Sequence, residues 1–294
     1  QVLVAVGLVG LATHDPTASR TVFLWLIALA AFAGATQDII VDAYRIEIAP
    51  LESQGALAAT YTLGYRLALI MSGAIVLYIA DLSGWRVAYL CMAALMVLPI
   101  IATLVCREPD ANRAIEPRRL DLVEAFAKPF ADFFQRNGWV LALALLAFVG
   151  LFKFPDQMIG VLAGPFYLDS GYTKTDIATV SKLYGVWIGI AGALLGGVCV
   201  AAFDIRRLLV VAAIAVAVSN LAFLLMAMFP SQQWAFIAAI TADNASQGFA
   251  GTTLVAFMSG LTHRHFTATQ YALLVSLANL PGKFVGGLSG YIVE

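Results

Sequence analysis

Residues 21–47 read TVFLWLIALAAFAGATQDIIVDAYRIE, and this stretch decides the fold class. Its part Thr21–Ala43 is apolar and long enough to cross a bilayer as a helix, which takes about 20 residues. Asp38 and Asp42 nevertheless stand inside it, and Arg45 follows. A charged side chain at the centre of a bilayer costs about 3 kcal/mol on an insertion scale. We therefore expect these carboxylates to face the interior of a helical bundle or a wet cavity.

The composition of the whole chain agrees with a membrane protein. Of 294 residues, 61% are hydrophobic and 12% are charged, whereas soluble domains carry roughly 25% charged residues. The mean hydropathy is +0.87. A net charge of -1 gives no basic surface for nucleic acid, so we expect no nucleic-acid partner. Because Gln1 opens directly on an apolar run, we interpret the chain as an internal part of a longer membrane protein.

Nine segments are apolar enough to be predicted as membrane-spanning helices, the first of them incomplete, with boundaries good to about two to four residues. Glycines spaced four apart, such as Gly192 and Gly196, predict faces where helices approach closely. The sequence therefore predicts an all-α membrane protein. The nine segments are Val2–Ala12, Thr21–Ala43, Gly55–Ala80, Trp85–Cys106, Trp139–Leu168, Ile177–Phe203, Leu208–Phe229, Trp234–Leu261 and Ala268–Val293.

One polar stretch divides the chain into two helical parts, residues 1–106 and 138–294. The stretch, residues 107–137, begins as a charged, proline-containing linker and ends with LDLVEAFAKPFADFFQRN. That second part predicts an amphipathic helix on the membrane surface, kinked near Pro129. Its apolar face is made by Val123, Phe126, Phe130 and Phe133.

Lysines and arginines are unevenly shared between alternating loops, which predicts the orientation. The loops on one side hold Arg45, the basic residues of the linker, Arg206, Arg207 and Arg264, and those on the other side hold Arg20, Arg86 and Lys174. The linker is therefore predicted to be cytoplasmic.

Ionisable residues inside the predicted spans are the candidate site residues, because they must be paired or face a cavity. They are Asp38, Arg66, Lys153, Asp156, Lys182, Asp243 and Lys283. Arg66 and Lys283 are the candidates for holding an anionic group. Lys153 and Asp156 are three residues apart and flank Pro155, which should break the helix. They form either a buried structural pair or part of a binding site.

The other candidates each allow two interpretations. Asp38 either belongs to a structural or gating ion pair or carries a proton. Asp42, near the membrane surface, either caps and snorkels or joins Asp38 in proton coupling. Asp243 and its polar neighbours either bind substrate or make hydrogen bonds between helices. Tyr65 either stacks on a sugar or ring of the substrate or packs in the core.

The motifs of several enzyme classes do not occur. The sequence holds no H-E-x-x-H, no G-x-S-x-G and no phosphate-binding G-x-x-x-x-G-K-[ST]. Its three histidines and three cysteines have no metal-ligand or disulfide spacing. We expect no cofactor, no metal and no enzyme activity. A membrane-embedded acyl or glycosyl transferase is the enzyme alternative, for which His263 and His265 are the only support.

Several stretches resemble one family. ATQDIIVDAYRIE is similar to the fourth-helix signature of AmpG-type muropeptide permeases, which belong to the major facilitator superfamily. GALAATYTLGYRLALIMSG and YTKTDIATVSKLYG match in the same order along the chain. The resemblance implies a major facilitator superfamily-like bundle, incomplete here and running from about the third to the eleventh helix, with the linker joining two halves.

The resemblance also implies a function: proton-driven import of N-acetylglucosamine–anhydro-muramyl peptides across the bacterial inner membrane, with a place in peptidoglycan recycling and β-lactamase induction. Asp38 and Asp42 take the positions of the family's paired helix-four aspartates. Arg66 takes that of its helix-five arginine, and Lys153 and Asp156 those of its helix-seven lysine and aspartate. This sequence departs from the pattern at several positions, among them Pro155 and the run NASQG, which replaces a more glycine-rich one. Asp243 stands where a glutamate is expected, and Lys283 where an arginine is expected.

These observations predict a multi-pass, proton-coupled secondary transporter in the inner membrane, acting as a monomer on an anionic glycopeptide. Asp38 and Asp42 are the candidates for proton coupling. The candidates for substrate binding are Arg66, Lys153, Asp156, Asp243, Lys283 and Tyr65. The alternatives are a carrier of the same fold for another substrate, such as acetyl-CoA or a drug, and a sensor that does not transport.

Overall fold

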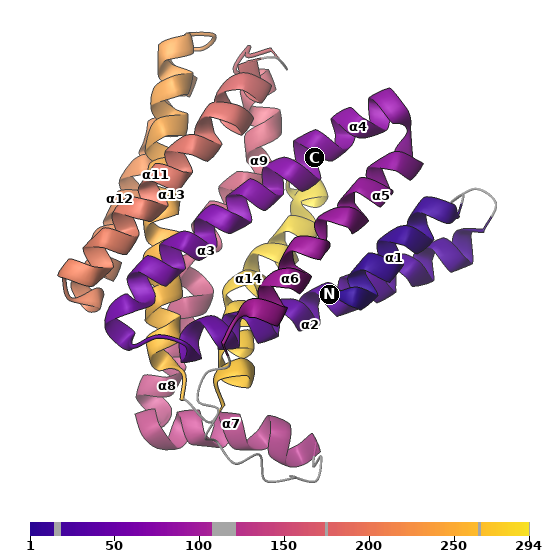
Figure 1. Ribbon diagram of the computed structural model, residues 1–294. Helices are drawn as coiled ribbons and strands as arrows, with labels where there is room; N and C mark the ends of the chain where they lie inside the picture. Colours follow the sequence, from indigo (N-terminus) through magenta and orange to yellow (C-terminus); the bar gives the residue numbers. More distant parts are fainter. Residues whose placement is uncertain (15–18, 108–121, 174–175, 264–265, 294) are drawn as a thin grey trace. The chain divides into compact units, whose positions relative to one another are not determined.

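The computed structural model of the chain describes residues 1–14, 19–107, 122–173, 176–263 and 266–293, and the regular elements within these ranges are helices (Figure 1). The chain divides into two compact units. The first comprises Gln1–Ile48 and Gly64–Arg118, and the second Ala49–Leu63 and Arg119–Glu294. The domain boundaries drawn from the sequence, at residues 107 and 138, stay predictions.

The first unit is built on the packing of α1 against α2 and α5, and of α4 against α5. Small residues allow the α1–α2 contact, because a Cβ placed on Gly7 would lie 3.0 Å from the Cβ of Ala30. Gly84 has a φ of 84°, a conformation that suits glycine, and it separates α4 from α5. The helices are α1 (Val2–Thr13), α2 (Arg20–Glu47), the end of α3 (Gln54–Leu69), the π-helix η2 (Ile70–Ile75), α4 (Val76–Ser83), α5 (Trp85–Leu95) and α6 (Val97–Val105).

In the second unit α13 packs against both α11 and α12, while α14 packs against α8 and α9. Phe236 and Ile240 of α13 form a core cluster with Tyr167, Tyr172 and Met226. The elements are η1 (Leu51–Ser53), the start of α3, α7 (Leu122–Asn137), α8 (Trp139–Phe152), α9 (Phe154–Asp169), the π-helix η3 (Ile177–Tyr184), α11 (Gly185–Ala202), α12 (Ile205–Met228), α13 (Gln233–Leu261) and α14 (Thr267–Val293).

Glycines bring α11 close to α13. A Cβ placed on Gly192 would overlap the carbonyl group of Ala245, and one on Gly196 would lie 2.9 Å from the carbonyl oxygen of Phe249. The backbones of the two helices therefore approach each other directly, which small residues permit in membrane bundles. The predicted packing role of Gly192 and Gly196 is confirmed.

The nine predicted spans all lie in helices, and this confirms the all-α fold class. Six stretches of the described residues are long and apolar enough to cross a membrane. The remaining three segments are α1, which has 12 residues, and α13 and α14, which carry polar residues such as Asp243 and Lys283. The six are Arg20–Glu47, Gln54–Ser83, Trp85–Val105, Ala127–Asp169, Ile177–Ala202 and Ile205–Met228.

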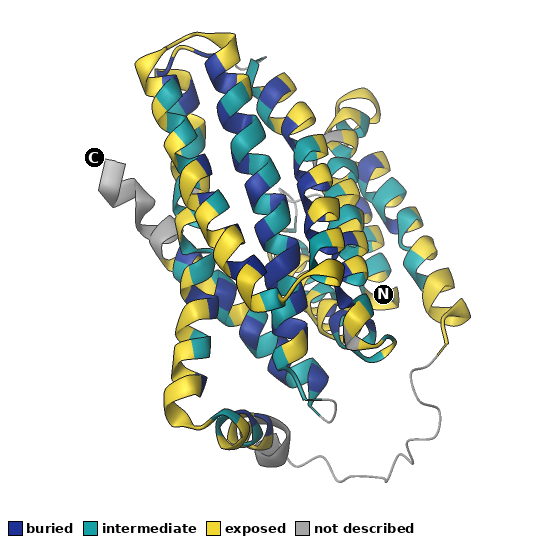
Figure 2. Ribbon diagram, turned by 90° about the vertical axis from the view of Figure 1, so that its left-hand side faces the viewer, coloured by how far each residue is buried: buried dark blue, intermediate teal, exposed yellow. Residues whose placement is uncertain are grey.

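Many large apolar side chains of the described helices are exposed, and Figure 2 colours the exposed residues yellow. Trp25 is 72% exposed, Leu104 80% and Val140 86%. An apolar surface on this scale is covered in nature by lipid or by other protein. Together with the six apolar helices, it identifies a multi-pass membrane protein.

The helix α7 follows the linker and contacts α8 and α14. Figure 1 shows it lying across the ends of these two helices. Of its predicted apolar face, Phe133 is buried and Phe130 is 44% exposed, while the side chains of Val123 and Phe126 lie outside the described part of the chain. Its placement on a membrane surface stays a prediction.

Candidate functional site

The charged residues of the opening stretch lie on the last turns of α2, in the first unit. Asp42 and Arg45 are both buried, with 8% and 6% of their surfaces exposed, and Nε of Arg45 lies 3.7 Å from Oδ1 of Asp42. Asp38, one turn earlier, is exposed and repels the Asp42 carboxylate, while Arg45 attracts it. Buried as they are, Asp42 and Arg45 do not snorkel to water. The arrangement is a carboxylate pair of which one member is held by a buried guanidinium.

Arg66 and Tyr65 belong to the part of α3 that lies in the first unit. Arg66 is half-buried, whereas Tyr65 is 58% exposed. Arg66 stands in the last turn of α3, directly before the π-helical turns of η2. Such π-turns occur frequently at functional sites. Consecutive residues of a helix point in different directions, so Tyr65 and Arg66 do not share a face.

The candidate site of the second unit lies around a break in the helix at Lys153. Pro155 has no N–H to donate to the carbonyl of Leu151, four residues earlier. Instead, the backbone N–H of Lys153 donates a hydrogen bond to the carbonyl of Leu151. The helix α8 therefore ends at Phe152, and α9 begins at Phe154. The break that the sequence predicted beside Pro155 is present, and its position follows from this exchange of hydrogen bonds.

Asp156 and Asp243 act on each other electrostatically within the second unit. Asp156 follows the break and is half-buried, and its carboxylate is attracted by Lys153 and repelled by Asp243. Asp243 of α13 is buried, with 8% of its surface exposed, and accepts a hydrogen bond of 2.7 Å from Nε2 of Gln247. Oδ1 of Asp156 is buried without a hydrogen-bond partner. The structure therefore brings Lys153, Asp156 and Asp243 into one electrostatic environment.

Part of the polar patch around Asp243 connects helices. The hydroxyl of Ser246 donates to that of Ser219 at 2.7 Å, which joins α13 to α12. The hydroxyls of Tyr184 and Thr241 lie 2.9 Å apart and join η3 to α13. The predicted alternative, hydrogen bonding between helices, therefore holds for Ser246.

Gln157 and Asn279 are candidate site residues that the sequence reasoning missed. Nε2 of Gln157 donates to Oδ1 of Asn279 at 3.3 Å and to the carbonyl of Ala278 at 3.4 Å. Oε1 of Gln157 is buried without a hydrogen-bond partner and lies against Gly282 of α14. Lys283, the next residue, is exposed. The available signal was an amide side chain inside an apolar segment, which is rare enough to mark.

No metal centre is found in the part of the chain that the structure describes: no three side chains of His, Cys, Asp or Glu gather there. A cavity of about 590 Å³ opens in the first unit between α1, α2 and α5, with His14 and Arg86 in its lining. It contains none of the predicted site residues. The roles predicted for those residues in proton coupling and substrate binding stay predictions.

Comparison with known proteins gives consistent similarities. The family model of the Major Facilitator Superfamily matches residues 1–286. A Rickettsia conorii protein described as putative transporter AmpG 4 is 32% identical over 300 residues, covering 99% of this chain and 71% of its own length. The anhydromuropeptide permease of Escherichia coli K12 is 33% identical over 299 residues, covering 100% of this chain and 59% of its own length. The putative transporter AmpG 3 of Rickettsia typhi is 29% identical over 271 residues, covering 90% of this chain and 64% of its own length.

Proposed function

The chain belongs to the major facilitator superfamily and, within it, to the AmpG transporters, and from this premise we propose that it imports anhydro-muropeptides across the inner membrane together with protons. It is a multi-pass inner-membrane transporter, and its permease relatives point to transport rather than catalysis. One observation carries the choice of substrate. The Escherichia coli relative that matches along the whole of this chain is named an anhydromuropeptide permease.

The proposed proton step uses the carboxylates of α2. A buried carboxylate gains a proton when its cationic partner moves away, and loses it when water or the cation returns. Asp42 has such a partner in Arg45 at 3.7 Å, and Asp38 lies one turn away with an exposed carboxylate. Rocking of a transporter between two states would change these surroundings and so load and release the proton.

The proposed substrate contacts follow from the chemistry of a muropeptide, which carries peptide carboxylates, an amino group and sugar rings. Arg66 and Lys283 supply cations for the carboxylates. Asp156 and Asp243, with Lys153, supply charged groups that can pair with an amino group or a carboxylate. Tyr65 offers a ring face for a sugar.

The test is uptake of radiolabelled anhydro-muropeptide by membrane vesicles that contain the transporter, with an imposed inward proton gradient. We expect accumulation that stops when a protonophore collapses the gradient, and that unlabelled anhydro-muropeptide competes away. Vesicles without the transporter are the control. Accumulation of acetyl-CoA in place of the muropeptide would contradict the proposed substrate. Uptake at the same rate with and without the proton gradient would contradict the proposed coupling.

A further inference from the structure

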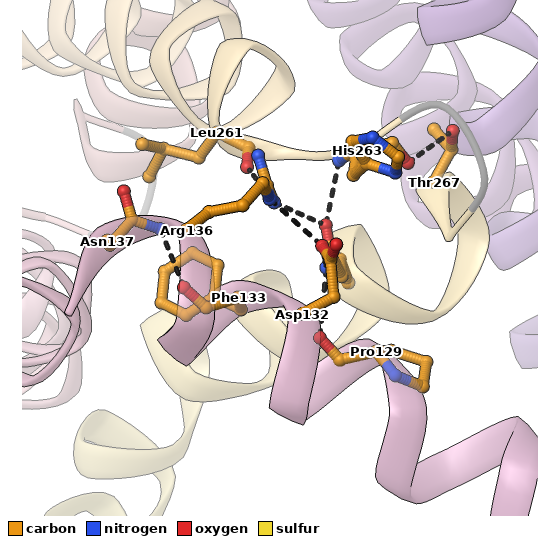
Figure 3. A network of polar contacts seen from close by, with 9 residues as sticks. Pro129, Asp132, Phe133, Arg136, Asn137, Leu261, His263 and Thr267 are labelled. Atoms are coloured by element: carbon orange, nitrogen blue, oxygen red, sulfur yellow. Dashed lines mark hydrogen bonds and ion pairs between the residues drawn. The ribbon is translucent and has the colours of Figure 1, made fainter. Parts of the chain in front are cut away.

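The side chain of Gln270, in the first turns of α14, makes four hydrogen bonds in a buried position. Figure 3 labels the four partner residues, Pro129, Asp132, Arg136 and His263. Only 3% of Gln270 is exposed. Its Oε1 accepts from the backbone N–H of His263 at 2.7 Å and from Nη2 of Arg136 at 3.2 Å. Its Nε2 donates to the carbonyl of Pro129 at 2.9 Å and to Oδ2 of Asp132 at 2.9 Å. A glutamine amide has two donor hydrogens and two acceptor lone pairs, so its full capacity is used.

The partners of Gln270 also hold one another. Nε of Arg136 donates to Oδ2 of Asp132 at 2.9 Å, one turn away on α7. Nη2 of Arg136 reaches the carbonyl of Leu261, the last residue of α13, at 3.3 Å. We call the side chains of Asp132, Arg136 and Gln270 the linker knot. It joins α7 to the end of α13 and to the start of α14.

The Gln270 amide lies among buried residues, whereas the side chains of Arg136 and Asp132 are 36% and 23% exposed. Pro129 is fully buried, Phe133 is 5% exposed and Thr267 is 2% exposed. The hydroxyl of Thr267 donates to the carbonyl of His263 at 3.3 Å, on the chain between α13 and α14. Polar groups in such a place are costly to leave unpaired. The helix α7 can therefore leave its site only if Nε2 of Gln270 loses both of its acceptors, Pro129 and Asp132, while Oε1 keeps the N–H of His263.

We infer that Gln270 is a positioning residue for transport: through the linker knot it fixes α7 to the end of α13 and the start of α14, so that this helix moves as one body with the rest of the second unit. A transporter of this superfamily rocks between states, and a helix that follows the linker has to move either with one half or independently. Because the linker knot bonds α7 to the end of α13 and the start of α14, α7 moves with these helices. The inference rests on the chain being a transporter, and it requires neither a muropeptide cargo nor a proton.

The first test measures amide hydrogen exchange of the transporter in lipid nanodiscs, without substrate. Gln270→Met keeps the length of the buried side chain but can neither donate nor accept as the amide does. Gln135→Met, at an exposed position of α7, is the matched control. We expect exchange in residues 127–137 to rise at least tenfold in Gln270→Met and to stay unchanged in Gln135→Met, with α11 and α12 protected in both. Unchanged exchange in Gln270→Met would overturn the inference.

A second variant covers the case in which Gln270→Met does not fold. Asp132→Asn keeps the shape of the side chain and removes the charge that holds Arg136. We expect a smaller rise of exchange, confined to α7, of about threefold. Exchange that rises equally in α11 and α12 would show a general loss of structure and would overturn the positioning role.

The third test asks whether transport requires α7 to stay attached. Asp132 and Gln270 are replaced by cysteine in a transporter whose Cys91, Cys106 and Cys199 are serine. We expect the initial uptake rate to fall at least tenfold and to recover to at least half when a short bifunctional maleimide joins the two cysteines. A joined transporter that stays inactive would show that α7 must detach in each cycle, and would overturn the inference. Failure of the proposed cargo is seen separately, as no uptake by the unaltered transporter.

Discussion

Gln157 of α9 donates a hydrogen bond to Oδ1 of Asn279 of α14 at 3.3 Å, and Nδ2 of Asn279 donates in turn to the carbonyl of Val275 at 2.9 Å. This order of donors fixes how both amides are oriented. Nε2 of Gln157 faces acceptors, and its Oε1 is left buried without a partner. The contact lies between the segment that follows the break at Lys153 and the segment that contains Pro281. It therefore joins the helix that begins after this break to a helix that contains a proline.

The amide of Asn279 both accepts and donates a hydrogen bond, whereas the amide oxygen of Gln157 has no partner. This difference predicts that substitutions of the two residues change the free energy of unfolding by different amounts. Asn279→Ala removes the acceptor of Gln157 and is expected to lower the free energy of unfolding by about 0.6 kcal/mol, the average for hydrogen bonds between membrane helices. Gln157→Met loses this bond and the long one to the carbonyl of Ala278, but it also removes a buried unpaired acceptor, so it should cost less than Asn279→Ala. Reversible unfolding in mixed micelles measures both. A larger loss for Gln157→Met would mean that Oε1 has a partner in the membrane.

The close contact of α11 and α13 predicts that one added methyl group is harmful. Gly192→Ala would place its Cβ against the carbonyl group of Ala245, so the helices must separate. Overpacking of this kind costs about 1–3 kcal/mol. Gly251→Ala, on α13 itself, is the matched control, since no atom lies within 4 Å of its added Cβ. The melting temperature of the purified transporter should fall for the first and not for the second. Equal melting temperatures would show that α11 and α13 lie farther apart.

The sequence was sufficient for the fold because the bilayer allows few structures. Backbone groups in lipid must bond internally, so each apolar run had to become a helix. The position of Pro155 was likewise enough to place the break near Lys153. The hydrogen-bond partners of Gln157 and Gln270 could not be predicted. Gln270 meets Asp132 across 138 residues of sequence, and no spacing rule relates residues on separate helices. The roles of Asp38, Arg66 and Lys283 in transport remain predictions, since side chains of a binding site are defined by a ligand.

A polar turn outside the spans predicts a dependence of stability on pH. Oδ2 of Asp176 accepts hydrogen bonds from the hydroxyl of Thr173 at 2.6 Å and from its backbone N–H at 2.9 Å. The N–H of Asp176 donates to the Thr173 hydroxyl at 3.1 Å, which completes a reciprocal cap before η3. The Thr173 side chain and then its backbone hold the pKa of Asp176 below the ordinary value of 3.8.

A lowered pKa in the folded state means that the ionised carboxylate stabilises the fold. This stability is fully present above pH 3.8 and is lost as the pH falls through the lower pKa of the folded state. We expect Asp176→Asn to lower the melting temperature at about pH 6, and the difference from the unaltered chain to shrink at about pH 3. Asp204→Asn is the comparison in another helix cap. Oδ1 of Asp204 accepts hydrogen bonds from the backbone N–H groups of Arg206 and Arg207 at the start of α12. A difference in melting temperature for Asp176→Asn that grows toward low pH would contradict the assignment.

The ion pair of α2 gives the most direct test of proton coupling. Asp42→Asn mimics the protonated acid and cannot release a proton, so we expect gradient-driven accumulation of anhydro-muropeptide to fall at least tenfold. Exchange of labelled for unlabelled substrate at equal concentrations needs no net proton movement, and it should persist. Asp38→Asn tests the exposed neighbour in the same assays, and Asp81→Asn, an exposed aspartate of α4, is the control. If Asp42→Asn and Asp38→Asn both concentrate substrate as well as the unaltered transporter does, the proton is carried elsewhere. If exchange is lost together with accumulation, these carboxylates serve binding or folding instead of coupling.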